Sequence, residues 1–174
     1  MAEQQEMLGE GKFVRLVRQG RWEFARRKNT TGIAVIVART NQDEIILVEQ
    51  FRPPIGKNVI ELPAGLIGDI PGQENEAFET AARRELLEET GFEAKRWTRL
   101  TEGPPSAGMI SEWITLFGAT DLTKINEGGG DETEDIKVHV IALDKVDAWL
   151  QQKAAAGIAI DPKVYSGLYF AAKL

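Results

Sequence analysis

The fold of this chain is decided by one stretch, Glu76-Ala-Phe-Glu-Thr-Ala-Ala-Arg-Arg-Glu-Leu-Leu-Glu-Glu-Thr-Gly91. Ala, Leu, Glu and Arg, all strong helix formers, fill most of its positions. Gly91 stands where a helix commonly ends in a left-handed residue. The stretch therefore predicts a helix over residues 76–90 that ends at Gly91.

Acidic side chains interrupt the apolar face of this helix. In a helical projection with Phe78 at zero, Ala82 and Leu86 define the apolar face at roughly 40° and 80°. Glu85 and Glu89 fall in the middle of that face, at roughly 340° and 20°. Buried carboxylates are costly unless a cation meets them, and i,i+4 acids also repel each other. These two glutamates therefore need an explanation.

Two interpretations of the acids are open from the helix pattern alone. A hard divalent cation such as Mg²⁺ or Mn²⁺ binds carboxylate oxygens and would neutralise Glu85, Glu89 and, at the edge of the face, Glu88. Alternatively, the acids lie on a solvated face, and Arg84 forms an ordinary i,i+4 ion pair with Glu88. The surrounding sequence has to decide between them.

Composition narrows the chemistry that the chain can perform. Its 174 residues carry 21 Lys and Arg against 27 Asp and Glu, a formal charge of −6, with one His and no Cys. The lack of Cys excludes disulfides, thiolate nucleophiles and Cys-based zinc sites. The single histidine, His139, lies in a period-2 strand pattern, which disfavours a Ser-His-Asp triad. We therefore expect catalysis by carboxylates, by metals bound through oxygen, or by both.

Length and charge indicate the setting in which the chain works. A chain of this length typically forms one domain. No apolar run approaches the roughly 18–20 residues that span a membrane, and the polar start lacks the apolar stretch of a signal peptide. Duplex nucleic acid is bound mainly through Lys and Arg, in which this acidic chain is poor. We therefore expect a cytoplasmic protein without nucleic-acid or membrane partners.

Strand patterns outnumber helix patterns in the rest of the chain. We expect two hairpin-connected pairs, 12–19 with 21–27 and 31–39 with 44–50. Further strands are expected at 59–62, 95–101, 110–119 and 136–143. Two closing helices, 144–156 and 161–173, each begin with an Asp in N-cap position, Asp144 and Asp161. The pattern predicts an α/β (α+β) fold, with a mixed sheet flanked by helices.

The helix resembles the signature of a known family. Residues Arg84 to Phe92 match the second half of the Nudix box, Arg-Glu-aliphatic-x-Glu-Glu-x-Gly-aliphatic, and Glu76 stands the required eight positions before Arg84. The chain departs from the box at Ile70, where the family has Gly. Gly65 supplies that Gly if five residues are inserted before the helix. The resemblance implies a Nudix-type α-β-α sandwich, and the insertion affects the loop before the helix.

Most of the chain resembles one branch of this family, the ADP-ribose and nucleoside-diphosphate-sugar pyrophosphatases. Four segments carry this resemblance, in order and at similar spacing: Val48-Glu-Gln-Phe-Arg-Pro-Pro54, Glu61-Leu-Pro-Ala-Gly65, Pro105-Ser-Ala-Gly108 and Glu132-Thr-Glu-Asp-Ile136. The site residues of the branch can therefore be carried over to matching positions.

The resemblance implies four metal ligands, which are Glu85, Glu89, Glu134 and the carbonyl oxygen of Ala64. It implies Glu132 as the general base, although Glu132 and Glu134 could exchange these roles. Glu88 is either a further ligand or the ionic partner of Arg84. Arg52 is expected to contact phosphate or ribose, with Glu61 in the same substrate-binding set. Alternatively, Arg52 pairs with Glu49 or Glu61.

A late acidic loop supports the same site independently. Residues Glu127 to Asp135 contain five acids and no base, around three consecutive glycines, Gly128 to Gly130. Such a run is usually a solvated loop. Glycines give the backbone freedom, so the acids could move onto a site once metal and substrate neutralise them. Together with the helix carboxylates, the run indicates a catalytic loop.

The N-terminal residues suggest a dimer. Trp22 and Phe24 share one face of a predicted strand, and such a pair is most often part of a core. In the resembling branch an N-terminal antiparallel sheet is exchanged between subunits and its aromatic residues stack on the base. A projecting hairpin alone has too little surface to be stable. We expect residues 1–28 to form a hairpin exchanged in a homodimer, and 29–174 to form the catalytic domain.

By this resemblance we expect a Mg²⁺-dependent pyrophosphatase, with Mn²⁺ as a substitute ion. It would hydrolyse ADP-ribose or a related nucleoside diphosphate sugar to a nucleoside monophosphate and a sugar phosphate. A GDP-mannose-type sugar nucleotide or a dinucleotide such as NADH is the alternative substrate. A Nudix-fold module that binds ADP-ribose without cleaving it is a less favoured alternative, because Glu85, Glu88 and Glu89 are all present.

Overall fold

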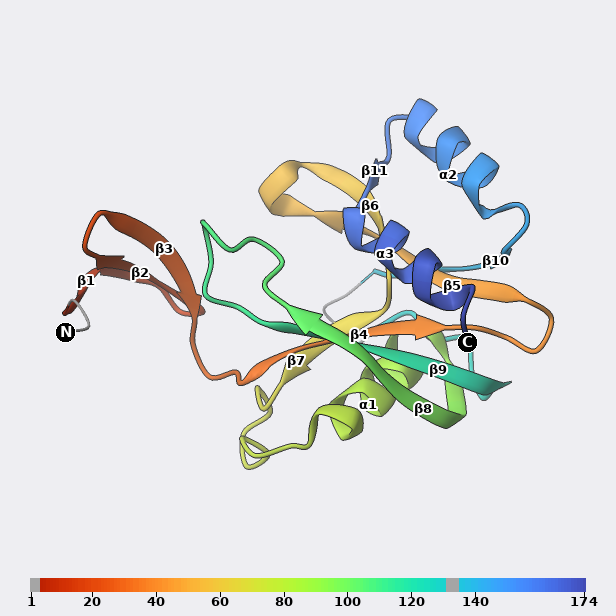
Figure 1. Ribbon diagram of the computed structural model, residues 1–174, viewed down its shortest axis with the longest axis horizontal. Helices are drawn as coiled ribbons and strands as arrows, with labels where there is room; N and C mark the ends of the chain where they lie inside the picture. The colour runs from red at the N-terminus through yellow and green to blue at the C-terminus, as the bar shows by residue number, and fades with distance from the viewer. Residues whose placement is uncertain (1–3, 131–134) are drawn as a thin grey trace.

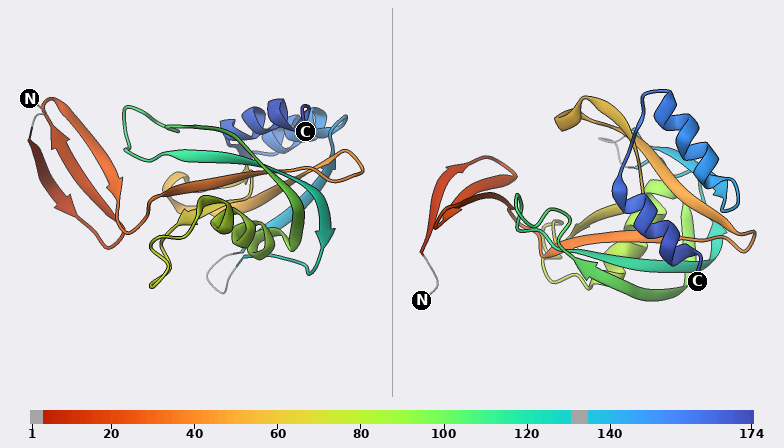
Figure 2. Two further views of the ribbon diagram at one scale, coloured as in Figure 1. Left: turned by 60° about the horizontal axis from the view of Figure 1, so that its bottom comes forward. Right: turned by 45° about the horizontal axis from the view of Figure 1, so that its top comes forward.

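The structure, a computed structural model, describes residues 4–130 and 135–174 of the chain. Within these residues, two four-stranded sheets and three α-helices form a main body, and a three-stranded antiparallel sheet projects from one end of it (Figures 1 and 2). The prediction of a mixed sheet flanked by helices is therefore confirmed.

The first sheet of the main body has the strand order β7-β4-β9-β8. Its strands are β4 (Gly32–Ala38), β7 (Ala64–Ile67), β8 (Phe92–Gly103) and β9 (Ile114–Lys124). Strands β4 and β9 are parallel, and Ile36 lies opposite Phe117. Strands β7 and β8 pair antiparallel with their neighbours, so the sheet is mixed.

The second sheet has the order β10-β5-β6-β11. Its strands are β5 (Glu44–Arg52), β6 (Lys57–Glu61), β10 (Lys137–Ala142) and β11 (Ala159–Ile160), with a 3₁₀ turn, η1 (Pro53–Ile55), between β5 and β6. The short strand β11 is parallel to β6. This pairing brings the C-terminal part of the chain to the end of β6.

Strand β4 is buried on both faces and organises the core. Ala34 and Ile36 pack with the apolar side chains of α1 (Phe78–Thr90). Val35 and Val37 alternate with them and pack with side chains of α2 (Val146–Ala155) and α3 (Pro162–Ala171). Helices therefore cover both sides of the central strands, which is the α-β-α sandwich that the sequence resemblance implies (Figure 1).

Two of the three predicted helix-capping residues are confirmed. Gly91 ends α1 with a φ of 74°, and its N–H donates to the Leu87 carbonyl at 2.9 Å. The side chain of Asp161 accepts from the N–H of Lys163 and begins α3. The N-cap prediction for Asp144 is wrong, because Lys145 occupies that position without a side-chain hydrogen bond.

The projecting sheet consists of β1 (Gln5–Glu10), β2 (Val14–Gln19) and β3 (Trp22–Arg27). The predicted hairpin is present as β2 and β3, but β1 adds a third strand that the sequence analysis missed. The segment Gln5-Glu-Met-Leu-Gly-Glu10 has little alternation of apolar and polar residues, so its strand depends on pairing with β2.

The projecting sheet has almost no core of its own. Among the described residues of its strands only Val17 is buried, whereas Met7, Leu16 and Trp22 are exposed. Backbone hydrogen bonds attach the end of the sheet to the main body, from the N–H of Ala25 to the carbonyl of Met109, for example. The sheet thus leaves a large apolar surface uncovered.

The described helices are short. The longest, α1, has 13 residues. None of the helices within residues 4–130 and 135–174 combines the length and apolar character needed to cross a bilayer.

Candidate active site

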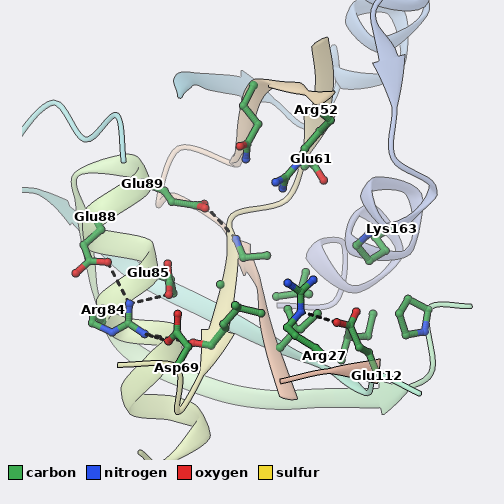
Figure 3. Close-up of a pocket in the computed structure, with 18 of the residues that line it drawn as sticks. Arg27, Arg52, Glu61, Asp69, Arg84, Glu85, Glu88, Glu89, Glu112 and Lys163 are labelled. Atoms are coloured by element: carbon green, nitrogen blue, oxygen red, sulfur yellow. Dashed lines mark hydrogen bonds and ion pairs between the residues drawn. The ribbon is translucent and has the colours of Figure 1, made fainter. Parts of the chain in front are cut away.

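A cavity of about 640 Å³ lies beside α1, a size typical of small-molecule sites. Its walls differ in charge. The wall formed by α1 carries three acids, Glu85, Glu88 and Glu89. The opposite wall carries three bases, Arg27, Arg52 and Lys163, together with two acids, Glu61 and Glu112 (Figure 3). This arrangement suits a ligand that binds cations on one side and basic side chains on the other.

The helix directs two of its acids inward, as the projection predicts. Glu89 is only 3% exposed, and the side chain of Glu85 is 13% exposed. The side chain of Glu88, at the edge of the face, is 47% exposed. The solvated-face alternative is therefore wrong for Glu85 and Glu89. The ion pair that this alternative predicts between Arg84 and Glu88 is present, at 3.2 Å.

Strand β7 passes directly beneath these carboxylates. The N–H of Ala64 donates to Glu89 Oε2 at 3.1 Å. Ala64 also lines the cavity, next to Gly65. Strand pairing with β4 holds Ala64 opposite Val35 and so fixes the backbone at this point. The structure thus brings together Ala64, Glu85 and Glu89, three of the four residues that the resemblance implies as metal ligands.

The carboxylate of Glu85 is buried and ionically coupled. Burial raises the pKa of Glu85 to about 7; Arg84 acts in the opposite direction, and the nearby acids Glu88 and Asp69 add to the increase. Arg84 Nη1 donates to Glu85 Oε1 at 2.7 Å. A carboxylate in such a place is stabilised by additional positive charge.

Arg84 forms ion pairs with acids of α1 and of the loop before it. It pairs with Glu76 at 3.3 Å and lies 3.9 Å from Asp69, in addition to its contacts with Glu85 and Glu88. Burial lowers its pKa, but pairing with Glu76 and Glu85 outweighs this effect and raises the pKa overall. Arg84 therefore remains cationic and orients the carboxylates of α1.

The acids fit a hard divalent cation, although they are not gathered as a finished site. Within the described residues, no three acidic or histidine side chains form a group that could hold a metal ion. Glu85 is directed to Arg84, and Glu89 to the N–H of Ala64. Two buried carboxylates one helical turn apart nevertheless supply the oxygen ligands that Mg²⁺ and Mn²⁺ prefer.

The late acidic loop follows β9 and packs against the C-terminal end of α1. The N–H groups of Gly129 and Gly130 donate to the carbonyls of Glu89 and Glu88 at 2.9 and 3.1 Å. A Cβ on Gly128 would lie 2.4 Å from the backbone carbon of Thr90, so the first glycine allows close contact with the helix end. The expected base Glu132 and ligand Glu134 lie outside the described residues.

The opposite wall consists of ion pairs. Arg52 Nε donates to Glu61 Oε2 at 2.6 Å, so the sequence alternative in which Arg52 pairs with Glu61 is observed. Arg27 Nε donates to Glu112 Oε1 at 2.6 Å. Each pair keeps a basic side chain at the cavity without leaving its charge uncompensated.

The aromatic residues Trp22 and Phe24 do not line this cavity within one chain. Both lie on β3, where Trp22 is 55% exposed. The Trp22 ring comes close to Gly108, in the loop that joins β8 and β9. The structure of a single chain therefore does not bring these residues together with the acids of α1.

Sequence reasoning missed three charged residues of the cavity. Asp69 lies in the loop between β7 and α1, Arg27 ends β3, and Lys163 lies in the first turn of α3. No motif contains Arg27 or Lys163. Only the N-cap signal of Asp161 pointed to the position of Lys163 at a helix start, and it said nothing of the cavity.

Comparison with known proteins gives the family. The model of the NUDIX domain matches residues 28–160. The ADP-ribose pyrophosphatase of Bacillus subtilis (strain 168) is 35% identical over 114 residues, 65% of this chain and 59% of the relative. The methanol dehydrogenase activator of Bacillus methanolicus is 34% identical over 123 residues, which are 70% of this chain and 64% of that protein.

A third relative and a solved structure agree. The GDP-mannose pyrophosphatase of Enterobacter sp. (strain 638) is 33% identical over 122 residues, 66% of this chain and 61% of the relative. The chain thus spans less than two thirds of the length of these relatives. A crystal structure of an ADP compounds hydrolase matches with a TM-score of 0.71 and 22% identity, covering 99% of this chain and 92% of the other, and supports the fold.

Proposed function

Because this chain belongs to the NUDIX domain family, we propose that it hydrolyses the pyrophosphate bond of a nucleoside diphosphate sugar, with ADP-ribose as the leading substrate. The products are a nucleoside monophosphate and a sugar phosphate. One observation carries the proposal: the carboxylates of Glu89, which is buried, and Glu85, which is largely buried, face a 640 Å³ cavity whose opposite wall carries Arg27, Arg52 and Lys163. A diphosphate bridged to acids by cations matches both walls.

Hydrolases of this family generally use a divalent metal, and we propose Mg²⁺, with Mn²⁺ as a substitute. The residues that would hold it are Ala64, through its carbonyl oxygen, Glu85, Glu89 and Glu134. When bound, the ion neutralises phosphate charge and makes water more acidic. Its oxygen ligands agree with the preference of Mg²⁺ for carboxylates and carbonyls.

The hydrolysis requires a base that removes a proton from the attacking water. The water oxygen forms a bond to one phosphorus, the bond from that phosphorus to the bridging oxygen breaks, and the base takes the proton. We assign this role to Glu132. The support for this assignment is the position of the preceding glycines. The N–H groups of Gly129 and Gly130 donate to the carbonyls of Glu89 and Glu88, which brings the loop to the end of α1.

Charged neighbours position the reacting groups. Arg84 orients Glu85 and Glu88 through contacts of 2.7 and 3.2 Å. Arg52, held by Glu61, is placed to contact a phosphate or the ribose from the opposite wall. Both arginines have planar guanidinium groups, which suit phosphate and carboxylate oxygens.

We also propose that two copies of the chain exchange the N-terminal segment 1–28, which contains the sheet β1–β3. The exposed apolar side chains Met7, Leu16 and Trp22 favour a covered position for this sheet. In a dimer, Trp22 and Phe24 would stack on the base of a nucleotide bound by the other subunit. The remaining residues, 29–174, form the catalytic domain.

A panel of nucleotide sugars tests the proposed reaction. Purified protein is incubated with ADP-ribose, GDP-mannose and NADH, with Mg²⁺ or with chelator, and the products are identified by mass spectrometry. We expect AMP and ribose 5-phosphate from ADP-ribose, and no turnover with chelator. Preferred cleavage of GDP-mannose or NADH would change the substrate but keep the reaction.

One result would overturn the proposal. If ADP-ribose binds in the presence of Mg²⁺ and neither it nor the other compounds are cleaved, the chain is a binding module instead. The presence of Glu85, Glu88 and Glu89 argues against that outcome, because a module that only binds has no need for three acids on one helix face.

A further inference from the structure

The basic wall of the cavity contains a lysine from the last helix, Lys163. It is the second residue of α3 and lines the cavity with Arg52 and Glu61. Figure 3 shows it on the side of Arg52, across the cavity from Glu85 and Glu89. Lys163 lies beyond residue 160, where the match to the family model ends.

A parallel strand pair places Lys163 on this wall. Strand β11 runs parallel to β6, with Ile160 opposite Ile60. The N–H of Asp161 continues this pairing and donates to the carbonyl of Ile60 at 3.0 Å. Because parallel strands end at the same edge, the start of α3 emerges beside Glu61, which holds Arg52. The position of Lys163 is therefore determined by the sheet.

Asp161 holds the side chain of Lys163. Its Oδ1 accepts from the backbone N–H of Lys163 at 2.7 Å and caps the helix, while its Oδ2 pairs with Lys163 Nζ. The side chain of Asp161 is 14% exposed and that of Lys163 is 31% exposed. An ammonium group has three donors, and among the described residues only Asp161 accepts from Nζ. Two donors thus remain for a ligand.

The chemistry of a diphosphate gives these donors a function. The non-bridging oxygens of each phosphorus point in several directions, so cations beside α1 reach only part of them. The oxygens that face the other wall need donors from the protein, and charge-assisted bonds to phosphate are strong. Arg27 and Arg52, each paired with a glutamate, are two such donors, and Lys163 is the third that this wall offers.

We propose that Lys163 Nζ donates a hydrogen bond to a non-bridging phosphate oxygen of the bound nucleoside diphosphate sugar, with Asp161 as the residue that positions it. This inference rests on the proposed function. It makes the last helix part of the substrate site, in addition to its role in the core through Val164 and Ala171.

Calorimetric titration of the full chain tests the assignment. The probe is the α,β-methylene analogue of ADP-ribose, which cannot be hydrolysed, with Mg²⁺ present. Lys163→Met keeps the length of the side chain and removes the charge, and it should weaken binding by about 10- to 100-fold, the loss expected for a hydrogen bond to a charged group. Lys163→Arg should recover most of the affinity, because it keeps a cationic donor.

A matched control comes from a lysine just after the end of α3. Lys173 pairs with the hydroxyl of Tyr169, and Lys173→Met should bind the analogue like the wild type. Thermal melting of all variants separates a local effect from unfolding. Because the Asp161 cap needs only the backbone of Lys163, the Met variant should melt close to the wild type. If the Met variant melts at a clearly lower temperature, the affinity of Lys163→Arg for the analogue, relative to that of the wild type, tests the assignment instead.

The outcomes separate the two proposals. If the wild type binds the analogue and Lys163→Met binds it equally well, the assignment of Lys163 is wrong and the proposed function stands. If Lys163→Arg binds as weakly as Lys163→Met, the contact is not a charge-assisted bond to phosphate, and the assignment is again wrong. If the wild type neither binds the analogue nor hydrolyses any nucleotide sugar, both proposals fail.

Discussion

The carboxylate of Glu85 lies directly over the backbone of Gly65. A Cβ at Gly65 would come within 1.8 Å of the carboxyl carbon of Glu85 and within 2.3 Å of both its oxygens. Gly65 belongs to strand β7. Glycine is therefore required here by the space that an acid of α1 occupies, and a residue in a strand controls the position of a candidate metal ligand.

Gly65→Ala should consequently reduce activity much more than stability. The added methyl group displaces the flexible end of Glu85, and a displacement of this size costs about 10²-fold in rate. Gly103→Ala is the control, because nothing lies within 4 Å of its added Cβ. Steady-state kinetics and thermal melting measure the two effects. Normal turnover of Gly65→Ala would contradict the role of Glu85.

Glu89→Gln should abolish most activity while the fold survives. The amide oxygen of Gln can still accept from the N–H of Ala64, so the local structure is kept. The substitution also removes the like-charge repulsion with Glu85 one turn earlier, so stability should stay unchanged or rise. We expect the rate to fall by more than about 10²-fold, because even the loss of a residue that only supports a metal ligand costs up to that much. Glu79→Gln, on the exposed side of α1, should keep full activity.

The two acids of the late loop should separate by role. Glu132→Gln should lower kcat by about 10²–10⁴ with little change in KM or Mg²⁺ requirement, because a base acts in the transition state. Glu134→Gln should raise the Mg²⁺ concentration for half-maximal rate. The reverse pattern would exchange the roles. If neither change matters, Glu112, which lines the cavity, is the next carboxylate to substitute.

Deletion of residues 1–28 should break the proposed dimer. The full chain should scatter light as a dimer at micromolar concentration, whereas the deletion should give monomers or aggregates and weaker substrate binding. Trp22→Ala should weaken substrate binding but keep the dimer, because it removes one stacking ring and leaves the rest of the sheet β1–β3 in place. A full chain that is monomeric under these conditions would exclude the exchange.

Glu49 should make the stability of the fold decrease as pH falls in the acid range. It is 8% exposed, and its oxygens accept from Lys153 and His139 at 2.8 Å and from Asn58 at 3.2 Å. Burial raises its pKa, but these three partners outweigh burial and lower the pKa from 4.5 to about 2. The folded state thus favours the ionised form. Its contribution is complete above pH 4.5 and is lost as pH falls from 4.5 to about 2.

Urea unfolding of Glu49→Gln should show this dependence. At pH 7 the variant should be less stable by about 2 kcal/mol, the value of a charged hydrogen bond. The difference from wild type should shrink steadily below pH 4.5, because the wild-type carboxyl becomes protonated as well. Glu79→Gln, half exposed, should lose at most about 0.5 kcal/mol at any pH. A constant difference across this range would rule out the ionised network.

The sequence alone determined the helix and the direction of its acids. Helix α1 ends at Gly91, and Glu89 points into the protein, as the projection predicts. Both features depend on the period of a helix and on contacts within one turn, which are local properties of the chain. The cap of α3 by Asp161 is local for the same reason.

Local patterns were insufficient where pairing decides the structure. Strand β1 has few apolar residues and is a strand because it pairs with β2. Asp144 has the right residue type for a cap, but α2 begins after Lys145. The choice of Arg52 between Glu49 and Glu61 was open, and the structure settles it because Glu49 is already bound by Lys153 and His139.

Only the tertiary structure placed the basic wall opposite the acids. Lys163 reaches the cavity because β11 pairs with β6, and Arg27 reaches it because its partner Glu112 lies in the loop before β9. These residues are far apart in sequence, and no periodicity relates them. The helical period says which side of an element a side chain takes, whereas strand pairing across the chain decides which side chains meet.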